Sequence, residues 1–172
     1  IPVYFKHDDT DCGDSLEAIY NNVKDALSDE YFVVPKNSSL RLESRNGESK
    51  NYTHIDVVPG RRVSDDPADK DVFLHQNQGE KTRLKTNLET HVNHILNSGV
   101  RPEIKLAKVW KIKNNISVKT FVLELMIVKV LAGRADKTLE ENIIYLLEQF
   151  RDNVNNISVQ DPANSGNDLT PI

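Results

Sequence analysis

Cysteine and long apolar runs are scarce in this chain. Cys12 is the single cysteine among 172 residues, so an internal disulfide is excluded and a reducing, cytoplasmic compartment is expected. Cysteine and histidine do not recur at the spacing of zinc ligands. The longest apolar run, at 121–128, is interrupted by Glu124 and is shorter than the roughly 18 residues that a membrane span needs. We therefore predict neither a disulfide-stabilised nor a membrane-spanning protein.

Charge is unevenly distributed along the chain. The net charge is −4, yet the segment 80–119 carries nine Lys and Arg residues against three Glu residues. Blocks of one sign indicate an anionic partner, such as a phosphate group or a nucleic acid. Within this segment Lys105, Lys108 and Lys111 recur at steps of three residues and share one side of an expected helix.

The first half of the chain has strand-like patterning around one helix. A capping residue at Asp14 or Ser15 predicts that the helix begins there. Asn46-Gly47 is a strong hairpin signal, and Pro59-Gly60 is expected to stop the strand that precedes it. The strands expected on these grounds cover residues 1–6, 31–34, 40–43 and 55–58.

The second half is expected to be helical. Residues 61–78 are polar and predict a long loop, and the helical pattern starts at about Lys81. Leu88 and Val92 in the first helix, and Leu139 and Leu147 in the last, are expected to face inward. The tail after Ser158 has turn composition. We predict an α+β protein, with a mixed β-sheet in 1–80 packed against a helical domain in 81–172. The expected helices cover residues 86–97, 101–113, 118–132 and 138–152.

Asp56 is an acid within the β-branched run Ile55-Asp56-Val57-Val58. Burying a carboxylate in such a strand is costly unless it has a partner or a metal ion, and the position near a strand end suits a catalytic or metal-binding group. The alternative is a turn or capping Asp that bonds to its own backbone. The acidic loop 8–14 lacks the glycine and glutamate of an EF-hand and is expected to be a solvated turn.

Lys108 lies between Ala107 and Val109, the most apolar surroundings of any lysine on its helix. A lysine at such a position can bind a phosphate as a point charge. The alternative is an ordinary surface lysine whose stem lies along apolar neighbours.

The order of several motifs resembles the polymerase-β-type nucleotidyltransferases. The resemblance is closest to the branch with oligoadenylate synthase, cyclic GMP-AMP synthase and the bacterial oligonucleotide cyclases of antiphage defence, and it covers nearly the whole chain. The motifs that carry it are Ile1-Pro2-Val3-Tyr4-Phe5, His54-Ile55-Asp56-Val57-Val58-Pro59, Leu106-Ala107-Lys108-Val109-Trp110-Lys111, Lys119-Thr120-Phe121-Val122-Leu123-Glu124 and Asp161-Pro162.

This resemblance implies a magnesium-dependent enzyme in which three carboxylates hold two Mg²⁺ ions. Asp56 matches the third carboxylate and would be both catalytic and metal-binding. Lys108 matches a lysine that contacts the triphosphate, and Thr120 lies near a serine that contacts phosphate. The other two carboxylates form an Asp-x-Asp pair after a Gly-Ser turn. Asp9-x-Asp11 has the spacing but not the turn, and it is not assigned.

The function implied for the complete protein is the synthesis of cyclic or linear oligonucleotides from nucleoside triphosphates. Because the chain opens at Ile1 within an expected strand, we expect a fragment that is inactive alone, completed by an N-terminal segment in the same or a separate chain. Two alternatives remain. One is a non-catalytic module that binds phosphate or nucleic acid through the basic segment 80–119. The other is a helical scaffold for a partner protein.

Overall fold

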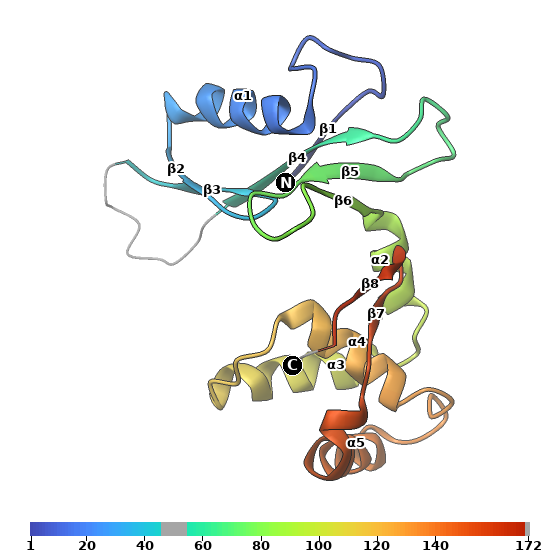
Figure 1. Cartoon of the computed structure of the whole chain (residues 1–172). Coiled ribbons are helices and arrows are strands. Elements are labelled where there is room, and N and C mark those ends of the chain that lie inside the picture. The colour runs from blue at the N-terminus through green and yellow to red at the C-terminus, as the bar shows by residue number, and fades with distance from the viewer. Residues whose placement is uncertain (46–54, 171–172) are drawn as a thin grey trace. The chain divides into compact units, whose positions relative to one another are not determined.

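The computed structural model describes residues 1–45 and 55–170, and the chain divides into two compact units, Ile1–Leu88 and Glu89–Ile172. The first unit contains β1 (Pro2–Phe5), α1 (Leu16–Ser28), β2 (Phe32–Pro35), β3 (Leu40–Glu43), β4 (Ile55–Arg62), β5 (Val72–His75) and β6 (Arg83–Thr86) (Figure 1). From the unit boundary onward come α2 (Leu88–Leu96), α3 (Arg101–Lys113), α4 (Thr120–Val130), α5 (Leu139–Asn153), a 3₁₀ turn (Val154–Asn156), β7 (Gln160–Asp161) and β8 (Asn164–Asp168). The predicted α+β class is confirmed.

The sheet of the first unit is mixed, as predicted. Among the described residues its strands run in the order β2-β3-β4-β5-β6 with antiparallel neighbours, and β1 pairs with β4 in parallel. Helix α1 covers one face of this sheet (Figure 1). It begins where the sequence predicted, because the Ser15 hydroxyl accepts the Ala18 N–H at 3.0 Å. Tyr20 of α1 is buried against Leu40, Leu42 and Val57 of the sheet.

Strand β4 does not stop at Pro59-Gly60, so that prediction is wrong. The strand continues to Arg62 because β1 and β5 both pair with its second half. The missing side chain of Gly60 allows this close approach. A Cβ at residue 60 would lie 2.6 Å from a methyl carbon of Leu74 and 2.8 Å from the carbonyl oxygen of Phe73. The glycine therefore permits strand pairing rather than ending it.

The predicted loop at 61–78 and the helical start at Lys81 are also wrong in part. Val72–His75 and Arg83–Thr86 pair as antiparallel strands, with Val72 opposite Thr86 and Leu74 opposite Leu84. Val72 and Leu74 are buried and alternate with less buried residues, which is a strand pattern too short to stand out from its polar flanks. The partner strand decides the conformation here.

The second unit is built around α3, α4 and α5. One core cluster joins these helices through Ile104, Leu123, Ile127, Leu131 and Leu146. The four predicted helices are all present, with Gly99 and Gly133 in the left-handed conformation after α2 and shortly after α4. Their predicted inward residues are partly wrong.

Four of the residues predicted to face inward are exposed instead. Helix α2 has no buried residue among those described, and α5 buries Asn142 and Leu146. The helical period was correct, but these four positions lie outside the buried contacts of α2 and α5. The exposed four are Leu88, Val92, Leu139 and Leu147.

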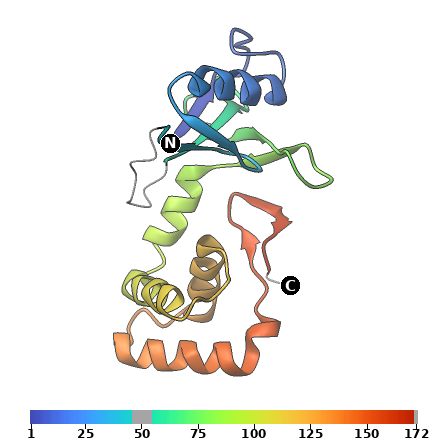
Figure 2. The ribbon, with the colours of Figure 1, turned by 90° about the vertical axis from the view of Figure 1, so that its left-hand side faces the viewer.

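The tail forms a β-hairpin, which its turn-like composition did not predict. Strands β7 and β8 pair after α5 (Figure 2), and Ile157 and Val159 pack into a second cluster with Val122, Leu125 and Met126 of α4. The predicted Asn46-Gly47 turn lies outside the described residues. Within the described part of the chain, no helix has the length and apolar character needed to cross a membrane.

Candidate functional site

Asp56 lies opposite Arg41 in the β3–β4 ladder. The Arg41 Nε–H donates to the Asp56 carboxylate at 3.1 Å, and both side chains are partly exposed, at 30% and 39%. Asp56 is the second residue of β4, so it lies near the beginning of that strand and not at the end predicted from Pro59-Gly60. Its charge is balanced by a cross-strand partner, and an exposed pair of this kind contributes little to stability.

A complete metal site is not present among the described residues. No group of three or more His, Cys, Asp or Glu side chains converges there. The acidic loop near the N-terminus is held through its backbone, because the Arg61 guanidinium donates to the carbonyl oxygens of Asp9, at 2.8 Å, and of Gly13. The described residues thus supply one candidate ligand, Asp56, and they do not fit a two-metal centre by themselves.

Lys108 forms an ion pair between two helices of the second unit. Its ammonium nitrogen on α3 lies 2.7 Å from a carboxylate oxygen of Glu124 on α4, with side-chain exposures of 42% and 15%. Ala107 is buried and Val109 is exposed, so Lys108 lies at the border of the core. Sequence reasoning missed this partner, although the acid within the apolar run 121–128 was its signal.

Thr120 is the first residue of α4 and lies one helical turn before Glu124. Residues four apart share one side of a helix, so the Lys108 ammonium is bound one turn from the start of α4. Lys119 precedes the helix, and within the described chain no side chain caps its first N–H groups at that position. The start of α4 combines a positive helix dipole with a nearby lysine, which is a favourable arrangement for an anion.

A cavity of about 300 Å³ lies beside the start of α4. The Asp168 carboxylate on its wall accepts the N–H and the hydroxyl of Thr170, and these hydrogen bonds hold the Asp168 pKa below its usual value. The cavity is therefore lined by an anionic side chain, Asp168, as well as by the cationic Lys119. Its lining residues are Ser117, Val118, Lys119, Val122, Asp168, Leu169 and Thr170.

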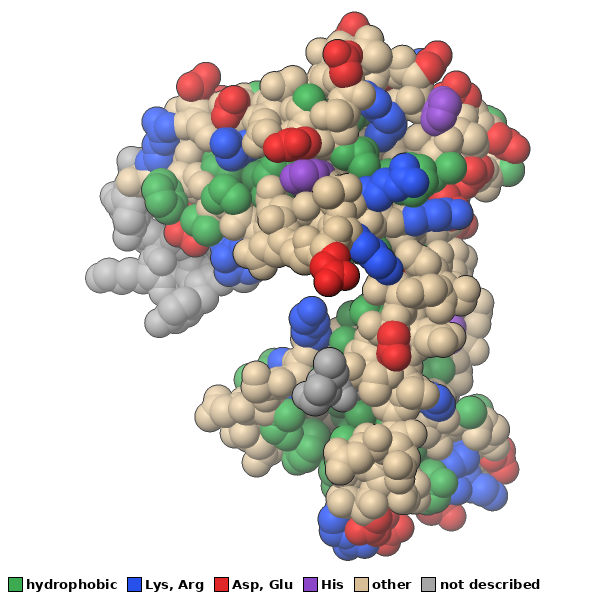
Figure 3. Space-filling view, in the orientation of Figure 1, with side chains coloured by type: hydrophobic (Ala, Val, Ile, Leu, Met, Phe, Trp, Pro, Cys, Tyr) green, Lys and Arg blue, Asp and Glu red, His purple; other side chains and the backbone are tan. Residues whose placement is uncertain are grey.

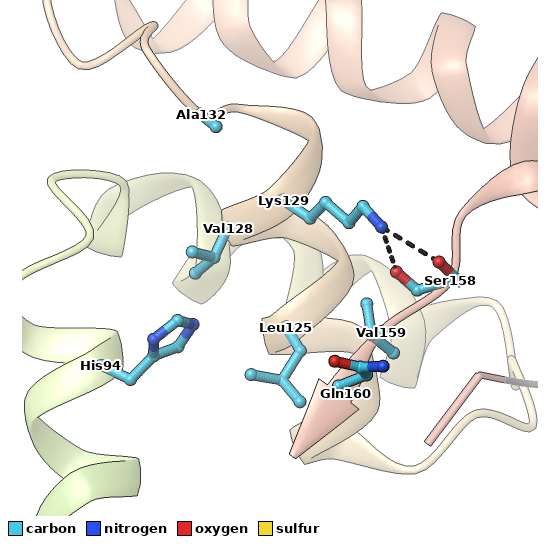
Figure 4. Close-up of a pocket in the computed structure, with 8 residues that line it drawn as sticks. All are labelled: His94, Leu125, Val128, Lys129, Ala132, Ser158, Val159 and Gln160. Carbon is cyan, nitrogen blue, oxygen red and sulfur yellow. Dashed lines mark hydrogen bonds between the residues drawn. The ribbon is translucent and has the colours of Figure 1, made fainter. Parts of the chain in front are cut away.

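A second cavity, of about 460 Å³, lies between α2, α4 and the tail (Figure 4). Figure 4 shows Leu125 and Val128 between His94 on one side and the tail residues on the other. Lys129 is already bound there, because its ammonium donates to the Ser158 backbone oxygen and, at 3.1 Å, to the Ser158 hydroxyl. These residues come from three distant segments, so no sequence motif pointed to them.

In the basic segment 80–119, Lys85 and Lys108 have acidic partners, and Arg83 lies over an aromatic ring. Lys85 of β6 lies 2.6 Å from Asp71, the residue before β5, and the Arg83 guanidinium lies over the Phe73 ring at 4.8 Å. Basic and acidic side chains are both present on each unit in the face that Figure 3 shows.

Of the three predicted site residues, Lys108 and Thr120 belong to the second unit, where Lys108 is bound to Glu124 one turn after Thr120, and Asp56 belongs to the first. The chain matches no protein-family model and no curated protein. It does match solved structures over most of its length.

Two such structures are from E. coli, and a third is from Vibrio cholerae. The 3′-deoxy GTP bound form of E. coli DncV is 17% identical over 90% of this chain and 43% of its own, with a TM-score of 0.61. CdnC of E. coli MS115-1, in a HORMA-deltaN complex, is 21% identical over 98% of this chain and 61% of its own, with a TM-score of 0.60. The V. cholerae DncV cyclic AMP-GMP synthase, with the linear intermediate 5′ pppA(3′,5′)pG, is 15% identical over 90% of this chain and 44% of its own, with a TM-score of 0.63.

These matches confirm the predicted resemblance at the level of the fold. The V. cholerae DncV cyclic AMP-GMP synthase is a prokaryotic cGAS homolog. The chain spans about half the length of these structures, from 43% to 61%. Both units thus have the fold of bacterial nucleotidyltransferases related to cyclic GMP-AMP synthase.

Proposed function

We propose that this chain is part of a nucleotidyltransferase and that its second unit binds the triphosphate of a nucleoside triphosphate. One observation carries the proposal: Glu124 holds the Lys108 ammonium at 2.7 Å, one turn from the start of α4. A phosphate there would meet a cation and the N–H groups of a helix end together. The fold supports this function, since DncV is seen with nonhydrolyzable GTP and CdnC with ATP.

Each residue of the site has a proposed role. Lys108 neutralises charge on the triphosphate, and Glu124 orients the lysine before the ligand arrives. Thr120 offers its hydroxyl and its backbone N–H at the helix end. Because the Lys108–Glu124 pair is already formed, less side-chain entropy is lost when the phosphate binds.

We further propose that Asp56 is a catalytic metal ligand of the complete enzyme. Mg²⁺ would there stabilise the attacking and leaving oxygens of phosphoryl transfer. Asp56 would supply one carboxylate of that site, and no group of three or more His, Cys, Asp or Glu side chains converges among the described residues. In the complete protein, the proposed products are cyclic or linear oligonucleotides that act in antiphage defence.

Calorimetric titration with a non-hydrolysable nucleoside triphosphate tests the binding site. We expect Lys108→Ala to weaken binding by about 1.5–3 kcal/mol, the usual range for hydrogen bonds to charged groups. Lys113→Ala is the matched control. Lys113 is exposed at the end of the same helix, and its substitution removes the same charge.

The two variants separate a specific contact from a general effect of charge. If Lys108→Ala and Lys113→Ala bind the triphosphate with equal affinity, Lys108 is an ordinary surface lysine. If both variants also lose affinity relative to the unsubstituted chain, and binding depends steeply on salt, the alternative of a phosphate- or nucleic-acid-binding module that uses the whole segment 80–119 is favoured.

A further inference from the structure

His91 and Asp161 connect α2 to the tail across 70 residues of sequence. The His91 Nε2 atom lies 2.6 Å from an Asp161 carboxylate oxygen, and the two side chains are 19% and 5% exposed. Asp161 also accepts the Ala163 N–H at 2.9 Å and the Asn167 side-chain N–H at 3.3 Å. A carboxylate this buried is stable only with such donors, so its orientation is fixed.

The His91 ring also contacts the beginning of α4. Its centroid lies 4.7 Å from that of Phe121, with the two planes at 44°. Phe121 is the second residue of α4, directly after Thr120, and it packs against the cluster formed by α4 and the tail. His91 is therefore in contact both with a fixed carboxylate and with the first turn of the helix proposed to bind phosphate.

We infer that His91 and Asp161 are positioning residues for the triphosphate site. Asp161 fixes the rotation of the His91 ring, and the ring holds Phe121 and the first turn of α4. This inference rests on the proposed function of Lys108 and α4. Backbone N–H groups bind a phosphate well only when they are held in place beforehand, because ordering them on binding would cost affinity.

Two substitutions of His91 separate its two contacts. His91→Gln retains a side-chain N–H donor for Asp161 but removes the ring that contacts Phe121. His91→Phe retains a ring and removes the donor. Asp161→Asn is the conservative variant, because it keeps an acceptor for His91, and Asp161→Ala removes it.

Thr138→Ala provides the control for a general loss of stability. The Thr138 hydroxyl caps α5 in a capping box with Glu141. Among the described residues, neither side chain forms a hydrogen bond with the start of α4. The loss of such a cap lowers the melting temperature of a protein of this size. It should not change the conformation of the first turn of α4.

Two readouts are needed, and both use the chain 1–172. The first is the backbone amide chemical shifts of Thr120, Phe121 and Val122 without ligand. The second is the affinity for a non-hydrolysable nucleoside triphosphate. We expect His91→Gln and His91→Phe to move these amide signals and to weaken binding about threefold to tenfold, as loss of an aromatic or hydrogen-bonding contact would. Asp161→Asn should lose less affinity than Asp161→Ala.

The outcomes distinguish this inference from the proposed function. Unchanged amide signals and affinity in both His91 variants would overturn it, and so would an equal loss of affinity in Thr138→Ala. If the unsubstituted chain binds no triphosphate, the proposed function fails. The amide signals then test only the structural half of the inference, that His91 holds the first turn of α4: movement in the His91 variants but not in Thr138→Ala supports that half, and no movement refutes it.

Discussion

Replacing Glu124 by glutamine should strengthen triphosphate binding. The amide oxygen of Gln can still accept from Lys108, so the orientation of the lysine is kept while the negative charge is removed. A phosphate oxygen bonded to the same ammonium would lie about 4.5 Å from the Glu124 oxygen, given two hydrogen bonds of ordinary length at a tetrahedral angle. Glu124 therefore repels the proposed ligand.

The size of this repulsion follows from the exposure of the pair. At 4.5 Å two unit charges repel by about 1 kcal/mol at the dielectric constant of water, and by about 4 kcal/mol at an effective value of 20. Lys108, where the phosphate would bind, is 42% exposed and Glu124 is 15% exposed, so we take the lower figure as the smallest expected gain. We expect Glu124→Gln to tighten binding about fivefold at low salt, which corresponds to about 1 kcal/mol.

Calorimetry at low and at high salt measures this effect. The gain should diminish at about 1 M salt, where the screening length falls to about 3 Å. Glu148→Gln is the matched control, since Glu148 is an exposed acid on α5 and the same charge is removed. Weaker or unchanged binding in Glu124→Gln at low salt would show that the phosphate does not lie on Lys108.

Three further predictions concern the first unit. In a longer form of the protein that has an Asp-x-Asp pair, Asp56→Asn should abolish nucleotide transfer but shift the melting temperature little, because Asn can still accept from Arg41; retained turnover would remove Asp56 from the site. Hydrogen bonds from Lys85 and Asn87 lower the pKa of Asp71, so its stabilisation is present above the unfolded pKa of about 3.9 and is lost as the pH falls through the lower folded value. Asp71→Asn should therefore have a lower free energy of unfolding than the unsubstituted chain at pH 7 and the same free energy of unfolding in strong acid, both measured by urea denaturation. A difference in this free energy that stays constant across pH would contradict the prediction. Gly60→Ala should lower the free energy of unfolding by about 1–3 kcal/mol, because its Cβ would be only 2.8 Å from a backbone oxygen; unchanged stability would mean that the β4–β5 pairing adjusts easily.

Local signals predicted the helices and the sheet's first strands well. Ser15, Gly99 and Gly133 mark helix ends through backbone chemistry that depends only on nearby residues. Strands β5 and β6 were missed because four-residue strands contain too few alternations and depend on each other for pairing. The same holds for the tail hairpin, whose position depends on a distant cluster with α4.

The candidate site residues were chosen one by one from the sequence, and their roles stay predictions. Of the two apolar neighbours that singled out Lys108, Ala107 is buried and Val109 is exposed. The pairing of Lys108 with Glu124 depends on how α3 and α4 pack, and no spacing in the sequence encodes it. The contacts of His91 with Phe121 and Asp161 were missed for the same reason, since they join three separate segments.

A structure of the chain with a non-hydrolysable nucleoside triphosphate and Mg²⁺ tests the central claim most directly. We predict a phosphate oxygen within hydrogen-bonding distance of the Lys108 ammonium and of a backbone N–H in the first turn of α4. A triphosphate bound only in the cavity between His94 and Lys129, or elsewhere with Lys108 still bound to Glu124 alone, would contradict the proposed site.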